Sequence, residues 1–130
     1  MNFVDANVFL YAVGNRVDLR EQAYEVFESA ERNYESLCTS AGVLEEICFV
    51  LWREGNDSLV GPALELVSWF DVQVWALEQE DVQQAVILRE MFRSVDAMDL
   101  CYLASCLRRN VSSLETFDRE LARAAAEILA

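Results

Sequence analysis

The sequence predicts a single α/β domain over residues 1–130, in which helices cover both faces of a short parallel sheet. The length of 130 residues suits one domain with one core. Short apolar runs of strand length alternate with longer segments whose apolar residues recur at helical spacing. Only four glycines and one proline occur, and no linker or repeat divides the chain. Strands separated by helices in this way are typical of a parallel sheet with right-handed crossovers.

The first half of the chain contains two predicted strands, each followed by a helix. In order, we expect a strand over residues 3–5, a helix over 7–13, a helix with its apolar face over 19–30, a strand over 36–39 and a helix over 41–52. The first helix ends near Gly14, a residue favoured after helix C-termini. The turn residues Gly55, Asn56 and Asp57 stop the last of these helices.

The second half repeats the alternation. In order, we expect a helix from Gly61 and Pro62 to about residue 70, a strand over 72–75, helices over 79–91 and 97–109, a strand within 111–116, and a closing helix with Leu121, Ala125, Ile128 and Leu129 on one face. Strands this short, separated by helices, predict a sheet that helices cover on both sides.

The composition excludes several kinds of chemistry. The chain has no histidine and no lysine, because all ten of its cations are arginines. Catalysis by Ser-His-Asp or Cys-His groups is therefore excluded, as are Schiff-base lysines and the P-loop lysine. The net charge of −13 also argues against a broad basic surface for duplex DNA.

Membrane insertion and structural disulfides are not expected. The longest apolar run, residues 47–52, falls far short of the roughly 20 residues that span a bilayer. Residues 1–5 lack the basic region of a signal peptide. The cysteines lie in apolar runs without C-x-x-C spacing, which is typical of small core residues and not of a zinc site; they are Cys38, Cys48, Cys101 and Cys106. These features predict a reduced, cytoplasmic protein that does not enter the membrane.

Acidic residues cluster where the predicted strands end. Asp5 ends the first strand, the helix after the second strand carries Glu46, and Asp99 and Asp118 flank the fourth. Ligands of open parallel sheets bind outside the carboxyl ends of the strands, so these four acids are candidates for one site. Each also has an ordinary role open to it, since aspartate is favoured at helix N-caps and in first helical turns. Glu46 and Asp99, however, lie within strongly apolar segments, where an unpaired acid is rarely buried.

Four converging carboxylates would repel one another strongly. At separations of about 5 Å and an effective dielectric of about 20, each pair would cost about 3 kcal/mol. The six pairs together would exceed the usual stability of a domain, so the group must take up protons or bind divalent cations. Oxygen-only ligands favour hard ions such as Mg²⁺ or Mn²⁺, and a metal-activated water is then the remaining plausible nucleophile.

Four segments carry these acids in order along nearly the whole chain. They are FVDANVFLY at residues 3–11, TSAGVLEEI at 39–47, AMDLCYLA at 97–104 and ETFDREL at 115–121. Together they resemble the motifs of the PIN-domain ribonuclease family. The resemblance implies a parallel sheet of four or five strands between helices, and cleavage of single-stranded or loop RNA that depends on Mg²⁺ or Mn²⁺.

The resemblance also assigns roles to individual residues and suggests partners. It implies that the metal-binding and catalytic acids are Asp5, Glu46, Asp99 and Asp118. Asn7 and Thr116 would hold carboxylates and water through hydrogen bonds. Small single-domain members of the family are typically VapC-type toxins, which form homodimers and are silenced by a cognate antitoxin protein. A chain of this length resembles that subgroup, with RNA as its substrate.

Some assignments stay open on the residues alone. Glu45 and Glu46 face directions about 100° apart on a helix, and the register of the motif favours Glu46. Asp96 and Asp99 are three residues apart and could share a face; the motif favours Asp99, leaving Asp96 as a cap or an auxiliary acid. RNA contact would fall to arginine, although each candidate is more typical of a solvated helix charge; the candidates are Arg53, Arg93, Arg108 and Arg109. The alternative function is a catalytically silent PIN scaffold that only binds RNA or protein.

Overall fold

The computed structural model describes residues 1–129 and has a four-stranded parallel sheet at its centre. The strands are β1 (Asn2–Val4), β2 (Leu37–Ser40), β3 (Gln73–Trp75) and β4 (Ser113–Glu115). They lie in the order β3-β2-β1-β4, and every neighbouring pair is parallel. The predicted parallel α/β fold is therefore confirmed, and β1 lies inside the sheet between two neighbours.

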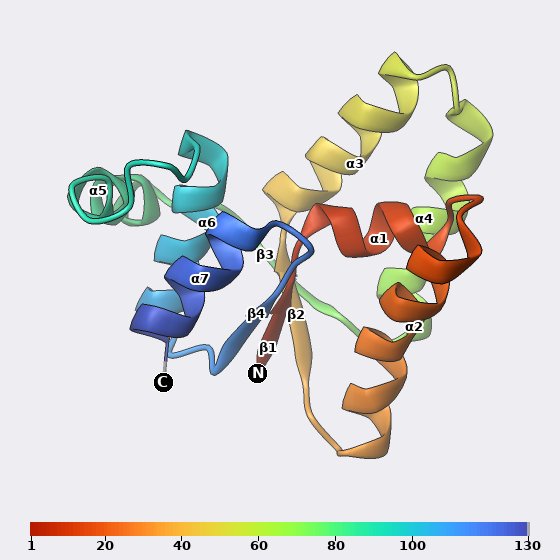
Figure 1. Ribbon diagram of the computed structural model, residues 1–130, viewed down its shortest axis with the longest axis horizontal. Coiled ribbons are helices and arrows are strands. Elements are labelled where there is room, and N and C mark those ends of the chain that lie inside the picture. The colour runs from red at the N-terminus through yellow and green to blue at the C-terminus, as the bar shows by residue number, and fades with distance from the viewer. Residues whose placement is uncertain (130) are drawn as a thin grey trace.

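Helices cover both faces of this sheet. They are α1 (Ala6–Ala12), α2 (Val17–Arg32), α3 (Ala41–Arg53), α4 (Val60–Trp69), α5 (Gln79–Leu88), α6 (Ala97–Arg108) and α7 (Arg119–Ile128), with a short 3-10 helix, η1 (Asp57–Leu59), before α4. Figure 1 shows α1, α2 and α4 on one side of the sheet and α5, α6 and α7 on the other. Helix α3 continues from β2 and packs against α1 and α4.

Aromatic side chains anchor the short strands in the core. The ring of Phe3 in β1 lies 6.0 Å from the ring of Trp75 and 5.9 Å from that of Tyr102, measured between centroids. In the α1–α2 layer, the rings of Phe9 and Phe27 lie 5.4 Å apart. Aromatic side chains bury about 150–250 Å² each, so a few such contacts hold strands of three or four residues in place.

Two predicted helices are shorter in the structure than the apolar pattern indicated. Helix α5 ends at Leu88 instead of residue 91, because Phe92 and Val95 turn into the core and take the chain out of helical register. The guanidinium of Arg89 donates hydrogen bonds to backbone carbonyls of this turn. The closing helix ends one residue before Leu129, whose backbone is extended.

A buried acid fastens α5 to the C-terminal end of α6. Asp81 is fully buried, and its Oδ1 accepts hydrogen bonds from Arg108 at 2.6 Å and from Arg109 at 2.9 Å. Arg109 also pairs with Glu78 at 2.6 Å and lies 4.8 Å from the centroid of the Trp75 ring. Burial alone would raise the pKa of Asp81, but hydrogen bonds from Arg109, the Glu78 backbone and Arg108 outweigh it and lower that pKa.

The cysteines are buried or half-buried in the folded chain. All four cysteines are free thiols; Cys38 and Cys106 are buried in the core, and the other two are half-buried. Within residues 1–129, no helix combines the length and the apolar character that crossing a membrane requires.

Replacing Asp81 with asparagine is expected to lower the free energy of unfolding by about 2 kcal/mol at pH 7, because two arginines lose a buried partner. The folded-state pKa of Asp81 is depressed, so its contribution is present above the ordinary value of 3.8 and is lost as the pH falls through the folded-state value. Urea unfolding of both proteins at pH 7 and pH 3 measures this: the gap in stability should narrow at the lower pH.

Glu90→Gln is the matched control for this measurement. Glu90 pairs with Arg93 at 2.9 Å, but both side chains are largely exposed, and exposed pairs contribute little to stability. If Asp81→Asn were as stable as the wild type at pH 7, the buried ion pairs would not be what fastens α5.

Candidate active site

Asp5 lies at the carboxyl edge of the sheet, near its centre. It directly follows β1 and caps the N-terminus of α1, where its Oδ1 accepts a hydrogen bond from the backbone N–H of Ala6 at 2.8 Å. The residue is only 3% exposed. Burial raises the pKa of Asp5 above its ordinary value, although its hydrogen bonds act in the opposite direction. An acid in this environment resists ionisation unless a cation stabilises its charge.

Thr116 holds the Asp5 carboxylate directly, and Asn7 holds Thr116. Thr116, just past β4, donates its hydroxyl to Oδ2 of Asp5 at 2.7 Å. The Nδ2 of Asn7 donates to the hydroxyl oxygen of Thr116 at 3.1 Å, and the Oδ1 of Asn7 accepts from the backbone N–H of Phe117 at 3.2 Å. The structure thus brings together Asp5, Asn7 and Thr116, and it links the turn after β1 to the turn after β4.

Glu46 reaches the same edge from α3. Its side chain is half-buried, and its Oε1 accepts a hydrogen bond from the hydroxyl of Tyr102 at 3.3 Å. Burial, followed by the negative charge of Asp5, raises the pKa of Glu46 to about 6. Glu45, its neighbour in sequence, is exposed. Of the two glutamates that the sequence left open, the structure brings Glu46 to the other acids.

Among these residues, Asp99 has the most strongly perturbed pKa. It lies half-buried in the first turn of α6, and its backbone N–H donates to the Oδ1 of Asp96, the exposed N-cap of that helix, at 2.9 Å. Burial, followed by the charges of Asp5, Asp96, Glu46 and Asp118, raises the pKa of Asp99 to about 8. We call these five residues, Asp5, Glu46, Asp96, Asp99 and Asp118, the carboxylate cluster.

Three members of the carboxylate cluster are helix N-caps. Asp118 caps α7, where its Oδ1 accepts from the backbone N–H groups of Glu120 at 2.9 Å and Leu121 at 3.1 Å. Asp5 and Asp96 cap α1 and α6. Figure 1 shows α1, α3, α6 and α7 all beginning near this edge of the sheet. The partial positive charge of helix N-termini offsets part of the repulsion between the carboxylates.

The carboxylate cluster has no cationic partner in the part of the chain that the structure describes. Within residues 1–129, no arginine forms an ion pair with any of its members. Across the same residues, no three acidic or thiol side chains lie close enough together to hold a metal ion as they stand. Carboxylate oxygens suit a hard dication chemically. Because the carboxylates repel one another, they can approach a common point only where the charge of a cation offsets that repulsion.

The arginines considered for RNA contact have other interactions. Arg108 and Arg109 pair with Asp81, Arg93 pairs with Glu90, and Arg53 lies 5.3 Å from the centroid of the Phe49 ring. None of these contacts is with the carboxylate cluster. Two of the four guanidiniums therefore stabilise the α5–α6 layer, which the sequence pattern did not reveal.

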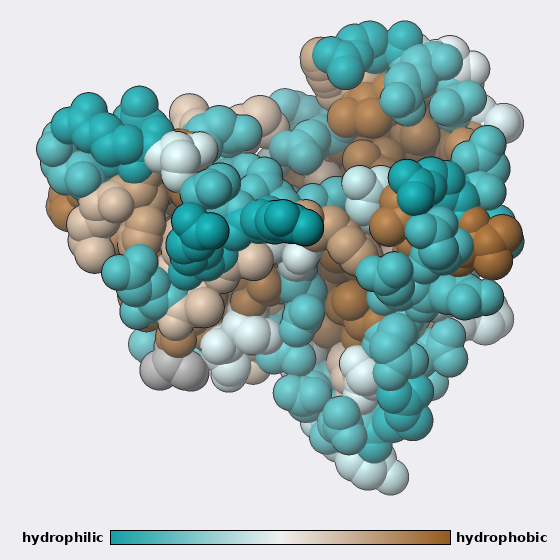
Figure 2. All heavy atoms as spheres, in the orientation of Figure 1, coloured by the Kyte–Doolittle hydropathy of each residue, from teal (hydrophilic) through white to brown (hydrophobic). Residues whose placement is uncertain are grey.

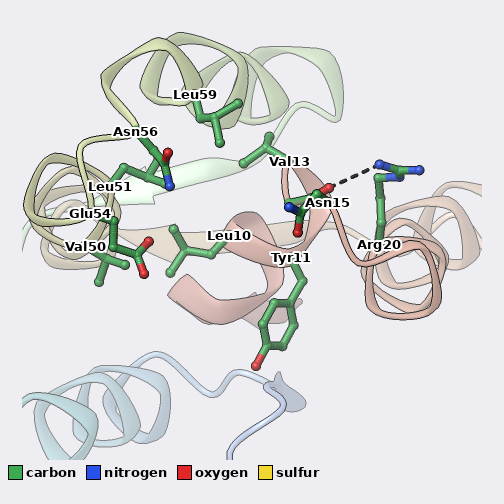
Figure 3. A pocket seen from close by; sticks show the side chains of 11 residues that line it. Leu10, Tyr11, Val13, Asn15, Arg20, Val50, Leu51, Glu54, Asn56 and Leu59 are labelled. Atoms are coloured by element: carbon green, nitrogen blue, oxygen red, sulfur yellow. Dashed lines mark hydrogen bonds between the residues drawn. The ribbon is translucent and has the colours of Figure 1, made fainter.

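Two cavities lie away from the centre of the carboxylate cluster. One of about 780 Å³ lies between the ends of α1 and α3, with Leu10, Leu51 and Glu54 among its lining residues (Figure 3). At its rim the guanidinium of Arg20 donates to the carbonyl oxygen of Gly14 at 3.1 Å, a bond drawn as the dashed line in Figure 3. Figure 2 shows hydrophobic residues between α3 and α4. The second cavity, of about 540 Å³ between α5 and α6, includes Asp96 in its lining. Neither cavity is centred on the carboxylate cluster, so the candidate site is marked by its perturbed carboxyl groups and not by a cavity.

One group in contact with the carboxylate cluster was not predicted from the sequence. Tyr102 lies in the apolar segment that follows Asp99, and its hydroxyl contacts Glu46. The signal available in the sequence was a tyrosine three residues after Asp99, within an otherwise aliphatic and small-residue segment. That signal indicates a polar atom within a buried helix face but does not identify its partner.

Comparison with known proteins places the chain in a family. The model of the PIN domain family matches residues 3–127. The chain is 39% identical over 124 residues to Ribonuclease VapC23 of Mycobacterium tuberculosis, an alignment that covers 95% of this chain and 98% of that protein.

Two solved structures share the fold. The crystal structure of Mycobacterium tuberculosis VapC20, described as a sarcin-ricin loop cleaving toxin, matches with a TM-score of 0.78 at 18% identity and covers 95% of each chain. VapBC2 from Rickettsia felis, bound to a DNA fragment from its promoter, matches with a TM-score of 0.71 at 15% identity, covering 94% of this chain and 91% of that one. On the family match and the identity to VapC23, the chain belongs to the PIN domain family and, within it, to the VapC ribonucleases.

Proposed function

We propose that this chain is a metal-dependent endoribonuclease that hydrolyses RNA phosphodiester bonds and is the toxin of a type II toxin–antitoxin pair. The observation that carries the proposal is the carboxylate cluster, in which three acids have raised pKa values and no arginine partner among residues 1–129. The names of the relatives, Ribonuclease VapC23 among them, support RNA as the substrate.

The residues that would hold the metal are Asp5, Glu46, Asp99 and Asp118. An oxygen-only ligand set favours Mg²⁺ or Mn²⁺ over softer ions, and the chain has no histidine to complete a zinc site of the usual kind. A divalent cation in such a site supplies a water nucleophile near neutral pH and offsets the charge that develops on the phosphate. Asp96 is a helix cap beside these four and serves as an auxiliary acid.

The chain's own residues prepare the site in two ways. The hydroxyl of Thr116, itself held by Asn7, fixes the rotation of the Asp5 carboxylate. The raised pKa of Asp99, about 8, keeps a proton on this carboxyl at neutral pH until a cation stabilises the ionised form. Without bound cations the carboxylate cluster repels RNA phosphates. Substrate binding and hydrolysis would therefore both require the bound cation.

Substitution of the cluster acids is expected to abolish RNA cleavage without unfolding the protein. Asp5→Asn and Asp99→Asn should have no measurable activity, and Glu46→Gln should lose more than about 100-fold, because each loses a carboxylate ligand. Cleavage of a structured RNA by the purified proteins, with Mn²⁺ and with EDTA, measures this. Circular dichroism verifies that each variant is folded.

Glu45→Gln is the matched control, since Glu45 is adjacent to Glu46 but exposed. It should cleave RNA like the wild type. Activity retained in Asp99→Asn would contradict the site assignment. Wild-type protein that binds RNA but does not cut it at any Mn²⁺ concentration would support the silent-scaffold alternative.

In the metal-free protein, ionised Asp99 is expected to destabilise the folded state. Because its folded-state pKa is raised from 3.8 to about 8, the stability present at low pH is lost progressively as the pH rises between these values. Asp99→Asn should therefore be more stable than the wild type at pH 8 in EDTA, by about 1 kcal/mol or more, and similar to it near pH 4. Urea unfolding at both pH values measures the difference.

Added Mn²⁺ should raise the melting temperature of the wild type at pH 8, because binding stabilises the folded state by mass action. The increase should be smaller at pH 5, where protons compete for the carboxylates. A stability difference between wild type and Asp99→Asn that is the same at pH 4 and pH 8 would contradict the electrostatic argument.

We further propose that the protein acts in the cytoplasm as a homodimer that a cognate antitoxin protein silences. The solved VapBC2 structure among its structural neighbours and the VapC names of its relatives support an antitoxin partner. Light scattering coupled to gel filtration should give about twice the 14.8 kDa of one chain. A mass that stays at 14.8 kDa up to high protein concentration would contradict the homodimer.

A further inference from the structure

Tyr102 lies beneath the carboxylate cluster with its only polar side-chain atom directed at one of the acids. The residue is 2% exposed, and its ring lies 5.9 Å from that of Phe3 in β1, measured between centroids. Its hydroxyl donates to the Oε1 of Glu46 at 3.3 Å. The contact joins α6 to α3, two helices that begin at the same edge of the sheet but are 56 positions apart along the chain.

Gly42 leaves room for this ring. A Cβ at position 42 would lie 3.2 Å from Cε1 and 3.5 Å from the hydroxyl oxygen of Tyr102. The first of these distances is tighter than ordinary van der Waals contact, so any side chain there would displace the ring. Gly42 lies four residues before Glu46, on the same face of α3. The ring therefore rests on the first turn of α3, and its hydroxyl reaches the second.

The hydroxyl is suited to hold a carboxylate. A tyrosine hydroxyl is a neutral hydrogen-bond donor at neutral pH. A hydrogen bond to a charged acceptor is stronger than one between neutral groups, and a buried hydroxyl that loses its partner pays a desolvation penalty. Rotation of Glu46 away from this position would therefore lose the hydrogen bond to the carboxylate and leave the buried Tyr102 hydroxyl without a partner.

We propose that Tyr102 is a positioning residue: by donating to Glu46 across the α3–α6 contact, and with Gly42 admitting its ring, it fixes the Glu46 carboxylate for metal binding. This inference rests on the proposed metal-dependent function. Tyr102 acts through Glu46, so its effect depends on that carboxylate being present.

The first test is Tyr102→Phe, which removes the hydroxyl and keeps the ring. Calorimetric titration with Mn²⁺ alone should show binding about 10-fold weaker than in the wild type, the effect expected when a hydrogen bond to a metal ligand is removed. RNA cleavage should fall at limiting Mn²⁺ and recover in large part at saturating Mn²⁺. A purely structural role would lower the melting temperature in EDTA and leave the Mn²⁺ affinity unchanged.

Three further variants make the test specific. Tyr24→Phe removes a hydroxyl from a half-buried tyrosine elsewhere, whose ring packs on Phe70, and should leave Mn²⁺ binding unchanged. Gly42→Ala should weaken Mn²⁺ binding, because the added Cβ would push the Tyr102 ring away by a few tenths of an ångström. In a Glu46→Gln background, adding Tyr102→Phe should change Mn²⁺ affinity less than about twofold, because coupled residues are non-additive.

The outcomes separate this inference from the function on which it rests. If the wild type binds Mn²⁺ and cleaves RNA, and both Tyr102→Phe and Gly42→Ala bind Mn²⁺ with wild-type affinity, the positioning role is overturned and the proposed function stands. If the wild type neither binds Mn²⁺ nor cleaves RNA, both are overturned. An equal loss of affinity from Tyr102→Phe with and without Glu46 would also overturn the role, because it would not act through that carboxylate.

Discussion

Repulsion between carboxylates is the constraint on which the rest of this structure depends. A parallel sheet brings distant chain segments to one edge, and here acids lie there from the turns after β1 and β4 and from the N-terminal turns of α3 and α6. The molecule tolerates the resulting charge in three ways. Thr116 and the Ala6 backbone donate hydrogen bonds to Asp5, the Asp96 and Asp118 carboxylates cap helix N-termini, and the raised pKa of Asp99 keeps a proton on that carboxyl. Each of these leaves the carboxylates able to respond to a cation.

The order of the strands and the contact between α5 and α6 hold this edge of the sheet in place. The sheet order places β1 between β2 and β4, so the residue after β1 is flanked by the turns that follow its neighbours. At the opposite end of α6, Asp81 and two arginines fix the helix against α5. Opposite charges are thus paired at the α5–α6 contact, where they stabilise the fold. Like charges lie together in the carboxylate cluster, where the proposed metal would bind. This division is a typical compromise between stability and activity.

Much of the candidate site could be predicted from the sequence, because it depends on which residues directly follow the strands. Asp5, Thr116 and Asp118 need only the strand positions, and the strand ranges agreed to within a few residues. Contacts between helices could not be predicted. The Tyr102–Glu46 contact depends on how α6 is rotated against α3, and the Asp81 ion pairs depend on how the first turn of α5 meets the C-terminal end of α6. Neither follows from one helix's own periodicity. Arg108 and Arg109 looked like solvated charges for the same reason.

Anomalous diffraction from crystals grown with Mn²⁺ would test most directly whether this edge binds a hard dication. An anomalous peak is expected within about 2–2.5 Å of carboxylate oxygens of Asp5 and Asp99, with Glu46 still in contact with Tyr102. Well-ordered crystals at saturating Mn²⁺ with no peak among residues 5, 46, 99 and 118 would contradict the metal site. The raised pKa values would then reflect only an acidic edge that takes up protons.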